Sequence, residues 1–161
     1  MARRLLWSIL FSILLLSGIS ALAQGPMPYG PPVSLENAKK AAAAAGAEAR
    51  KNGWTMAISV VDPSGTLVYY EKMDNTQTGS AKVSIDKARS AALFKRPTKV
   101  FQDHLAAGSA GLPILGVEGA TPIEGGIPLV IDGHIVGAIG VSGDSSDHDA
   151  LCAQAGVDTL K

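Results

Sequence analysis

The sequence predicts an α+β fold in which an antiparallel sheet of about five strands, built from two hairpins, is packed by helices. Three observations lead to this prediction. Strand-like pairs flank two tight turns, at 62–65 and at 132–133; helical segments lie before, between and after these pairs; and strands and helices do not alternate one by one. Because a short turn joins only antiparallel neighbours, parallel βαβ units are excluded.

The helix predictions rest on apolar spacing and on residues that begin and end helices. Ser34 can cap an alanine-rich helix that runs through Arg50, and Asn52-Gly53 ends it. Pro97 ends a second helix, and Thr98 is placed to cap a short third one. In the second helix, apolar residues at spacings of four, three and four predict one buried stripe: Ala81, Ile85, Ala88 and Ala92.

The strand predictions rest on β-branched and apolar runs beside turn residues. These runs are 55–61 with 66–71, and 127–131 with 135–141. Between the second pair, Asp132-Gly133 predicts a type I′ turn, which needs positive φ at both residues. The Gly-rich segment Gly108–Gly126 is long for a loop, so it is either functional or contains a further short strand, for which Leu112–Val117 is the candidate. A last helix is expected to begin at Ser145 or Ser146.

The amino terminus is predicted to be a signal peptide, residues 1–23. Arg3 and Arg4 precede an uncharged, mostly apolar run, and Ala21-Leu22-Ala23 has the small-x-small form of a peptidase cleavage site. The alternative is a retained membrane anchor, because the run approaches the length of a bilayer span. Cleavage would give a periplasmic or secreted protein without stable membrane insertion, in which 24–33 is an extended Pro/Gly-rich lead-in and 34–161 a single domain.

Composition excludes several classes of protein. The chain has 161 residues with 14 Lys+Arg against 14 Asp+Glu, and this balance argues against a nucleic-acid partner. Its one cysteine, Cys152, excludes an internal disulfide and zinc sites built on two or more cysteines. We expect Cys152 to be buried and inert, and the alternative is pairing between subunits.

The sequence lacks three familiar catalytic or binding motifs. No serine lies in a Gly-x-Ser-x-Gly elbow, and no Lys-Ser or Lys-Thr follows the glycine pairs as in a phosphate loop. The histidines also lack the short spacing of a zinc protease: His104, His134 and His148. Four cations lie within eleven residues around the end of the second helix: Arg89, Lys95, Arg96 and Lys99. They can complement the helix dipole or bind a carboxylated ligand.

Several ordered blocks of the sequence resemble the GlcG/HbpS family of haem-binding proteins. The resemblance extends from Ser34 to Lys161 and is carried by the blocks 60–68, 72–74, 87–98, 125–129 and 132–143. It implies a compact α+β fold with an antiparallel sheet, a sandwich of the profilin/PAS-like kind. It also implies assembly into a homo-oligomer and the binding of haem, with haem degradation in some members.

The resemblance further implies where haem would bind. The Arg-Pro-Thr block of the family falls on Arg96, Pro97 and Thr98, which makes the Thr98 hydroxyl a candidate ligand of haem iron. A neutral hydroxyl is a weak iron ligand beside imidazole. His104, six residues beyond Thr98, is therefore kept as the alternative axial ligand, and helix capping as the alternative role of Thr98. Arg96 and Lys99 are expected to pair with haem propionates.

Apolar contact with the porphyrin is expected from Phe101, together with Phe94 and Val100. The expected function is scavenging, storage or sensing of haem, with slow degradation if an open iron position admits peroxide. Two alternatives stay open. One is an enzyme acting on an organic acid or aldehyde in a pocket formed by the loops at Gly125-Gly126 and Gly140–Gly143. The other is a non-catalytic structural or sensory oligomer.

Overall fold

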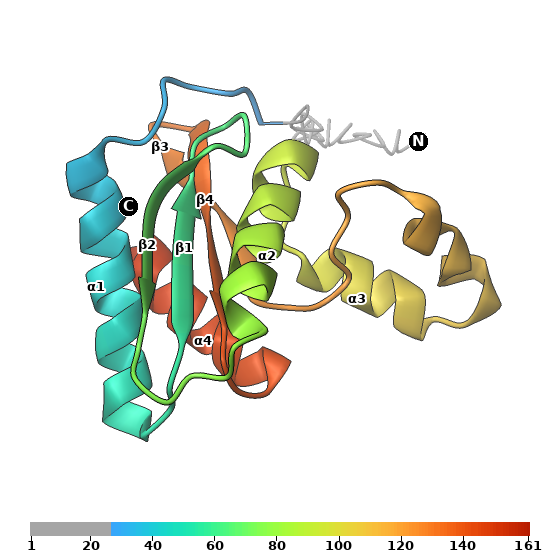
Figure 1. Cartoon of the computed structure of the whole chain (residues 1–161). Coiled ribbons are helices and arrows are strands. Elements are labelled where there is room, and N and C mark those ends of the chain that lie inside the picture. The colour runs from blue at the N-terminus through green and yellow to red at the C-terminus, as the bar shows by residue number, and fades with distance from the viewer. Residues whose placement is uncertain (1–26) are drawn as a thin grey trace, which may run out of the picture.

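The structure is a computed structural model and describes residues 27–161. These residues form four antiparallel strands and five helices (Figure 1). The predicted signal peptide lies outside these residues. The helices are α1 (Leu35–Asn52), α2 (Ser80–Phe94), α3 (Lys99–Ala106), the 3-10 helix η1 (Ser109–Gly116) and α4 (Ser146–Asp158). The strands, in spatial order, are β2 (Leu67–Lys72), β1 (Ala57–Val61), β4 (His134–Ser142) and β3 (Gly126–Ile131). The predicted α+β class, with a sheet built from two hairpins, is confirmed.

The sheet lies between two layers of helices. α2 packs on one face, across β1, β4 and β3, while α1 and α4 pack together on the other face (Figure 1). Small residues permit the close approach of these layers. A Cβ added at Gly140 of β4 would lie 3.0 Å from the Ala88 Cβ of α2. The buried residues of α1 are all small: Ala38, Ala41, Ala42, Ala45, Gly46 and Ala49.

Local sequence signals correctly predict the ends of α1 and the second hairpin. Ser34 Oγ accepts a hydrogen bond from the Asn37 N–H at 3.2 Å, and Gly53 ends α1 with a φ of 75°. Asp132 and Gly133 have φ angles of 49° and 74°, so the type I′ turn between β3 and β4 is confirmed. Both features depend only on neighbours in the sequence.

The candidate strand at 112–117 does not form. This segment belongs mainly to η1, so the sheet of the described residues has four strands instead of about five. Pro113 lies inside it and lacks the N–H that a sheet ladder needs. Gly111 packs against the His104 carbonyl with no room for a side chain, so η1 folds back on α3. Together α3 and η1 form an arm, residues 99–116, that extends from the sheet (Figure 1). The arm carries the exposed side chains of Leu112 and Leu115.

The buried stripe of α2 is rotated by about one residue from the predicted one. Ala88 and Ala92 are buried as expected, but Ala81 and Ile85 are only partly buried. Ser80 and Ser84, which precede Ala81 and Ile85, are buried instead, and Lys87 is buried as well. The prediction failed here because a lysine and two serines do not score as core residues, although each finds a polar partner inside the protein.

Residues 27–33 run beside the start of β4. The Gly30 N–H donates to the Ile135 carbonyl at 2.9 Å, and the Val33 N–H donates to the Val136 carbonyl at 2.7 Å. The Tyr29 hydroxyl reaches across to α2, where it donates to the Ala92 carbonyl at 2.8 Å. Among the described residues, no helix combines the length and apolarity that a membrane crossing needs.

Cys152 of α4 is buried, as predicted, and is not in a disulfide. Burial raises the pKa of its thiol to about 12, and the nearby carboxylates of Asp149, Glu48 and Asp144 act in the same direction. The reactive form of cysteine is the thiolate. Cys152 is therefore a packing residue at neutral pH and supplies no nucleophile.

Candidate functional site

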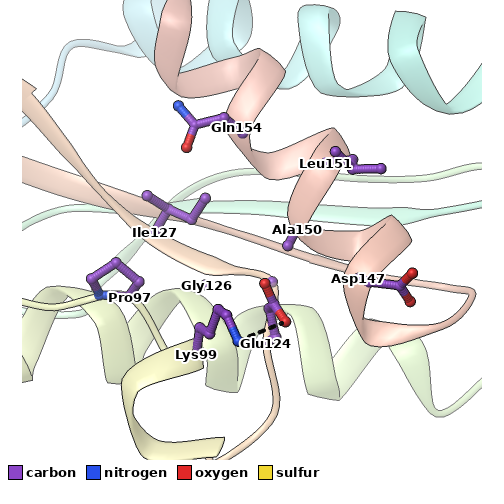
Figure 2. A pocket seen from close by; sticks show the side chains of 10 residues that line it. Pro97, Lys99, Glu124, Gly126, Ile127, Asp147, Ala150, Leu151 and Gln154 are labelled. Atoms are coloured by element: carbon purple, nitrogen blue, oxygen red, sulfur yellow. Dashed lines mark ion pairs between the residues drawn. The ribbon is translucent and has the colours of Figure 1, made fainter. Parts of the chain in front are cut away.

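A cavity of about 480 Å³ lies at the β3 edge of the sheet, between the start of α3 and α4 (Figure 2). We call it the edge cavity. Its walls are mostly apolar and come from Pro97, Ile127, Ala150 and Leu151. Its size is within the usual range for pockets that hold a small organic molecule or cofactor.

Two glycines form the floor of the edge cavity. A Cβ at Gly125, which has a φ of 119°, would lie 2.8 Å from the Val141 carbonyl oxygen and 2.9 Å from the Asp149 Cβ. A Cβ at Gly126 would overlap the Lys87 carbonyl and lie 2.7 Å from the Thr98 Cγ2. Both positions therefore exclude a side chain, and β3 begins directly against α2 and β4. Of the two loops expected to form a substrate pocket, this is the one that lines the cavity.

The second of those loops is used for packing. A Cβ at Gly140 would overlap the Ser84 carbonyl of α2. A Cβ at Gly143 would overlap the Thr55 carbonyl and lie 2.8 Å from the Met56 sulfur. The glycines at 140 and 143 thus bring backbone segments together and do not line the edge cavity.

Thr98 lies behind the cavity floor and is fully buried. Its Oγ1 accepts a hydrogen bond from the Gly126 N–H at 2.9 Å, and its own N–H donates to the Gly126 carbonyl at 2.9 Å. Thr98 occupies the N-cap position of α3, but its side chain makes no capping hydrogen bond there. The capping alternative is therefore wrong: the hydroxyl joins the start of β3 to the junction between α2 and α3.

Charged side chains stand at the mouth of the edge cavity. Lys99 Nζ lies 2.7 Å from Asp103 Oδ1. It also lies 3.9 Å from Glu124 Oε2 (Figure 2). The hydrogen bond that Lys99 donates to Asp103 raises the pKa of Lys99, so this amine is a cation at neutral pH. Asp147, in the first turn of α4, adds a second carboxylate to the lining. The mouth can bind one anionic group at Lys99 and disfavours a second one beside Glu124 and Asp147.

Arg96 and Phe101 lie outside the edge cavity. Arg96 is exposed and lines a separate hollow of about 520 Å³, with Leu93, Phe94, Lys95 and Val100, which we call the Arg96 hollow. The Arg96 Nε donates to the Phe94 carbonyl at 2.9 Å, and its guanidinium lies 5.8 Å from the centre of the Phe101 ring. Phe101 is itself buried and packs edge to face with Phe94 at 5.4 Å.

His104 is exposed in the last turn of α3. Six residues separate it from Thr98, which is about 9 Å along a helix axis. His104 does not line the edge cavity or the Arg96 hollow. Of the five residues predicted to hold haem, only Lys99 therefore lines the edge cavity, and the five do not converge on one hollow within this chain.

A buried ion pair beneath the cavity floor was not predicted. Lys87 Nζ lies 2.6 Å from Asp149 Oδ2 and donates to the Val141 carbonyl at 3.1 Å, with both side chains out of contact with solvent. Burial lowers the pKa of Lys87 and raises that of Asp149, while their mutual attraction opposes both shifts. One signal could have revealed Lys87: with Ser80, Ser84 and Ala91 it completes a stripe at spacings of four, three and four.

The edge cavity suits a porphyrin ring and one of its acid groups. Apolar walls can cover the ring, and Lys99 can pair with a propionate. The cavity lining is poorly suited to ligate the iron, because no side chain in it is an imidazole, thiolate, phenolate or thioether. Among the described residues, no three of the His, Cys, Asp and Glu side chains are grouped to hold a metal ion.

These features define a small α+β domain with a ligand-sized cavity at the edge of its sheet. The chain belongs to the HbpS-like family: the family model, described as haem-degrading protein HbpS-like, matches residues 33–158. Protein GlcG of Escherichia coli K12 is 39% identical over 113 residues, which cover 68% of this chain and 81% of GlcG.

Two solved structures show the same fold. A double mutant of HbpS from Streptomyces reticuli is 30% identical, with a TM-score of 0.75, over 85% of this chain and 92% of that chain. The PduOC:heme complex is 26% identical, with a TM-score of 0.73, over 81% of this chain and 96% of that chain. Haem-binding structural relatives are thus present among the proteins that this chain resembles.

Proposed function

We propose that this protein is an exported haem-binding protein that scavenges, stores or senses haem. One observation carries the proposal: a largely apolar cavity with a lysine at its mouth, in a chain of the HbpS-like family. The haem complex of a structural relative supports it. Arg3, Arg4 and the Ala21-Leu22-Ala23 sequence support export to the periplasm or the exterior.

In this proposal Pro97, Ile127 and Leu151 contact the faces and edge of the porphyrin. Lys99 weakens its hydrogen bond to Asp103 and pairs with a propionate. The second propionate faces solvent, because the carboxylates at the cavity mouth would repel it. When bound, haem would supply redox chemistry at an incompletely ligated iron, which is the basis for slow degradation.

The two candidate iron ligands need further rearrangement. Thr98 would have to release the Gly126 N–H before its hydroxyl could turn toward a bound ligand. His104 points to solvent on the arm, so it would serve a haem bound elsewhere or at a contact between copies in a homo-oligomer. Neither ligates from the cavity wall. We therefore propose that the ring and its acid groups, more than the iron, supply most of the binding energy.

Two titrations of the purified protein test this function. Hemin is added while the Soret band is recorded, and metal-free protoporphyrin IX is added while its fluorescence is recorded. We expect saturation at one porphyrin per subunit or fewer, with affinities for the two ligands within about tenfold, or about 1.4 kcal/mol. No Soret shift at micromolar hemin would contradict haem binding. Tight hemin binding without protoporphyrin binding would show instead that iron ligation dominates.

One specific observation favours the alternative that the protein is an enzyme: the glycine floor of the edge cavity. A small organic acid could pair with Lys99 in the same place. If hemin does not bind, a screen of short organic acids and aldehydes for turnover tests this alternative. Light scattering on the eluting protein tests the proposed homo-oligomer, which a strictly monomeric mass would contradict.

A further inference from the structure

The buried ion pair joins three elements that meet under the edge cavity. Lys87 comes from α2, its carbonyl partner Val141 from β4, and Asp149 from α4. The second oxygen of Asp149 accepts the Asp144 N–H at 3.2 Å, which ties down the segment that leads into α4. The two bonds that Lys87 makes cross between separate elements, so the pair fixes where α4 begins relative to α2 and β4.

The cavity floor separates this pair from a ligand by a single backbone segment. A Cβ at Gly125 would lie 3.0 Å from Lys87 Nζ and 2.9 Å from the Asp149 Cβ. The same glycine lines the edge cavity. The pair is thus in contact with the floor, and the helix that carries Asp149 also carries the wall residues Ala150 and Leu151.

Stability alone does not account for a fully buried ion pair. Removing two charges from water costs about as much as their attraction returns, and apolar replacement of both partners is often neutral or stabilising. What such a pair adds is a defined distance and direction between the elements that it joins. Here those elements are the floor and one wall of the edge cavity.

We propose that Lys87 and Asp149 are positioning residues of the edge cavity, which hold the Gly125-Gly126 floor and the α4 wall at the separation that a flat ligand requires. The inference builds on the proposed function for its ligand, but the fixed separation is a property of the protein without ligand. Neither residue touches the ligand. Their effect is on its affinity through the geometry of the cavity.

The test compares two double variants that each remove one ion pair of α2. Lys87→Met with Asp149→Asn removes the buried pair and keeps the side-chain volumes and the acceptor for the Asp144 N–H. Lys82→Met with Asp86→Asn removes an exposed pair of the same helix and is the matched control. Thermal unfolding, hemin affinity and hydrogen–deuterium exchange of 124–127 and 141–151 are measured on both variants and on the unchanged protein.

The expected result is a folded Lys87→Met/Asp149→Asn variant whose hemin dissociation constant rises at least tenfold and whose exchange increases selectively in these two segments. The control should match the unchanged protein in both measurements. A folded variant with unchanged exchange and unchanged affinity overturns the proposal. If the unchanged protein does not bind hemin, the proposed function fails, and the exchange measurement alone decides the positioning role.

A second variant covers the case in which the double variant does not fold. Asp149→Glu keeps the ion pair but lengthens it by one methylene group, so it should displace α4 and weaken hemin binding at least fivefold while the protein stays folded. Unchanged affinity and exchange in folded Asp149→Glu overturns the proposal. Loss of the fold in both variants also overturns it, because the pair would then be a requirement of folding itself.

Discussion

The edge cavity and the Arg96 hollow share no lining residue, and they differ in how they are built. The edge cavity is framed by three elements far apart in sequence and has a floor that tolerates no side chain. The Arg96 hollow is lined by residues 93–96 and Val100, which are neighbours in the chain. Lys95, with a φ of 55°, ends α2, and α3 begins at Lys99. This change of direction sends Arg96 and Lys99 to different surfaces.

A run of cations in sequence therefore does not define one binding site. The backbone between them decides which cations share a surface. We expect ligand binding to depend on the residues of the edge cavity and to be nearly independent of the Arg96 hollow and the arm. Three substitutions, each with a counterpart, test this difference.

The largest effect is expected from Gly126→Ala. The new Cβ would overlap the Lys87 carbonyl and crowd Thr98, so backbone must move, and we expect a loss of about 3 kcal/mol in the free energy of unfolding. Gly116→Ala, on the arm, has no atom near the added Cβ and should change stability by less than about 0.5 kcal/mol. Urea unfolding measures both. Equal effects at the two positions would show that the cavity floor is not tightly packed.

A smaller effect is expected from Leu151→Glu. Leu151 is exposed and lines the edge cavity, so the substitution removes apolar contact and adds an anion beside Asp147; we expect hemin affinity to fall about tenfold. Leu115→Glu makes the same change at an exposed leucine of the arm and should leave affinity within about twofold. The Soret titration measures both. A larger loss for Leu115→Glu would move the site to the arm.

The smallest effect is expected from Lys99→Ala. Lys99 is half exposed, so its pairing with a propionate is worth little in water, and we expect hemin affinity to fall about threefold to fivefold. Arg96→Ala should change it by less than about twofold. The difference between the two variants should shrink as salt is raised. The reverse order of effects would place the propionates in the Arg96 hollow, as the sequence alone suggests.

The parts of the fold that the sequence predicts well are those fixed by near neighbours. The Ser34 cap, the Gly53 stop and the Asp132-Gly133 turn each depend on a few adjacent residues. The candidate strand at 112–117 does not form because an apolar run is compatible with a strand or with a helical turn, and Pro113 lacks the N–H that a sheet ladder needs.

The sequence does not predict the buried ion pair of the candidate site, because its two residues meet only through the tertiary fold. Lys87 and Asp149 are 62 positions apart, and their pairing depends on how α2 and α4 pack on opposite faces of the sheet. No local pattern encodes that distance. The sequence does mark Gly125-Gly126 and Lys99, which line the edge cavity, but it cannot show that the α2–α3 junction turns Arg96 away.

A crystal structure of the protein grown with hemin, with the iron located by its anomalous scattering, tests the central claim most directly. We expect one iron per occupied site inside the cavity bounded by Pro97, Ile127 and Leu151, with a propionate at Lys99. An iron bound next to Arg96 or coordinated by His104, with the edge cavity empty, would contradict it.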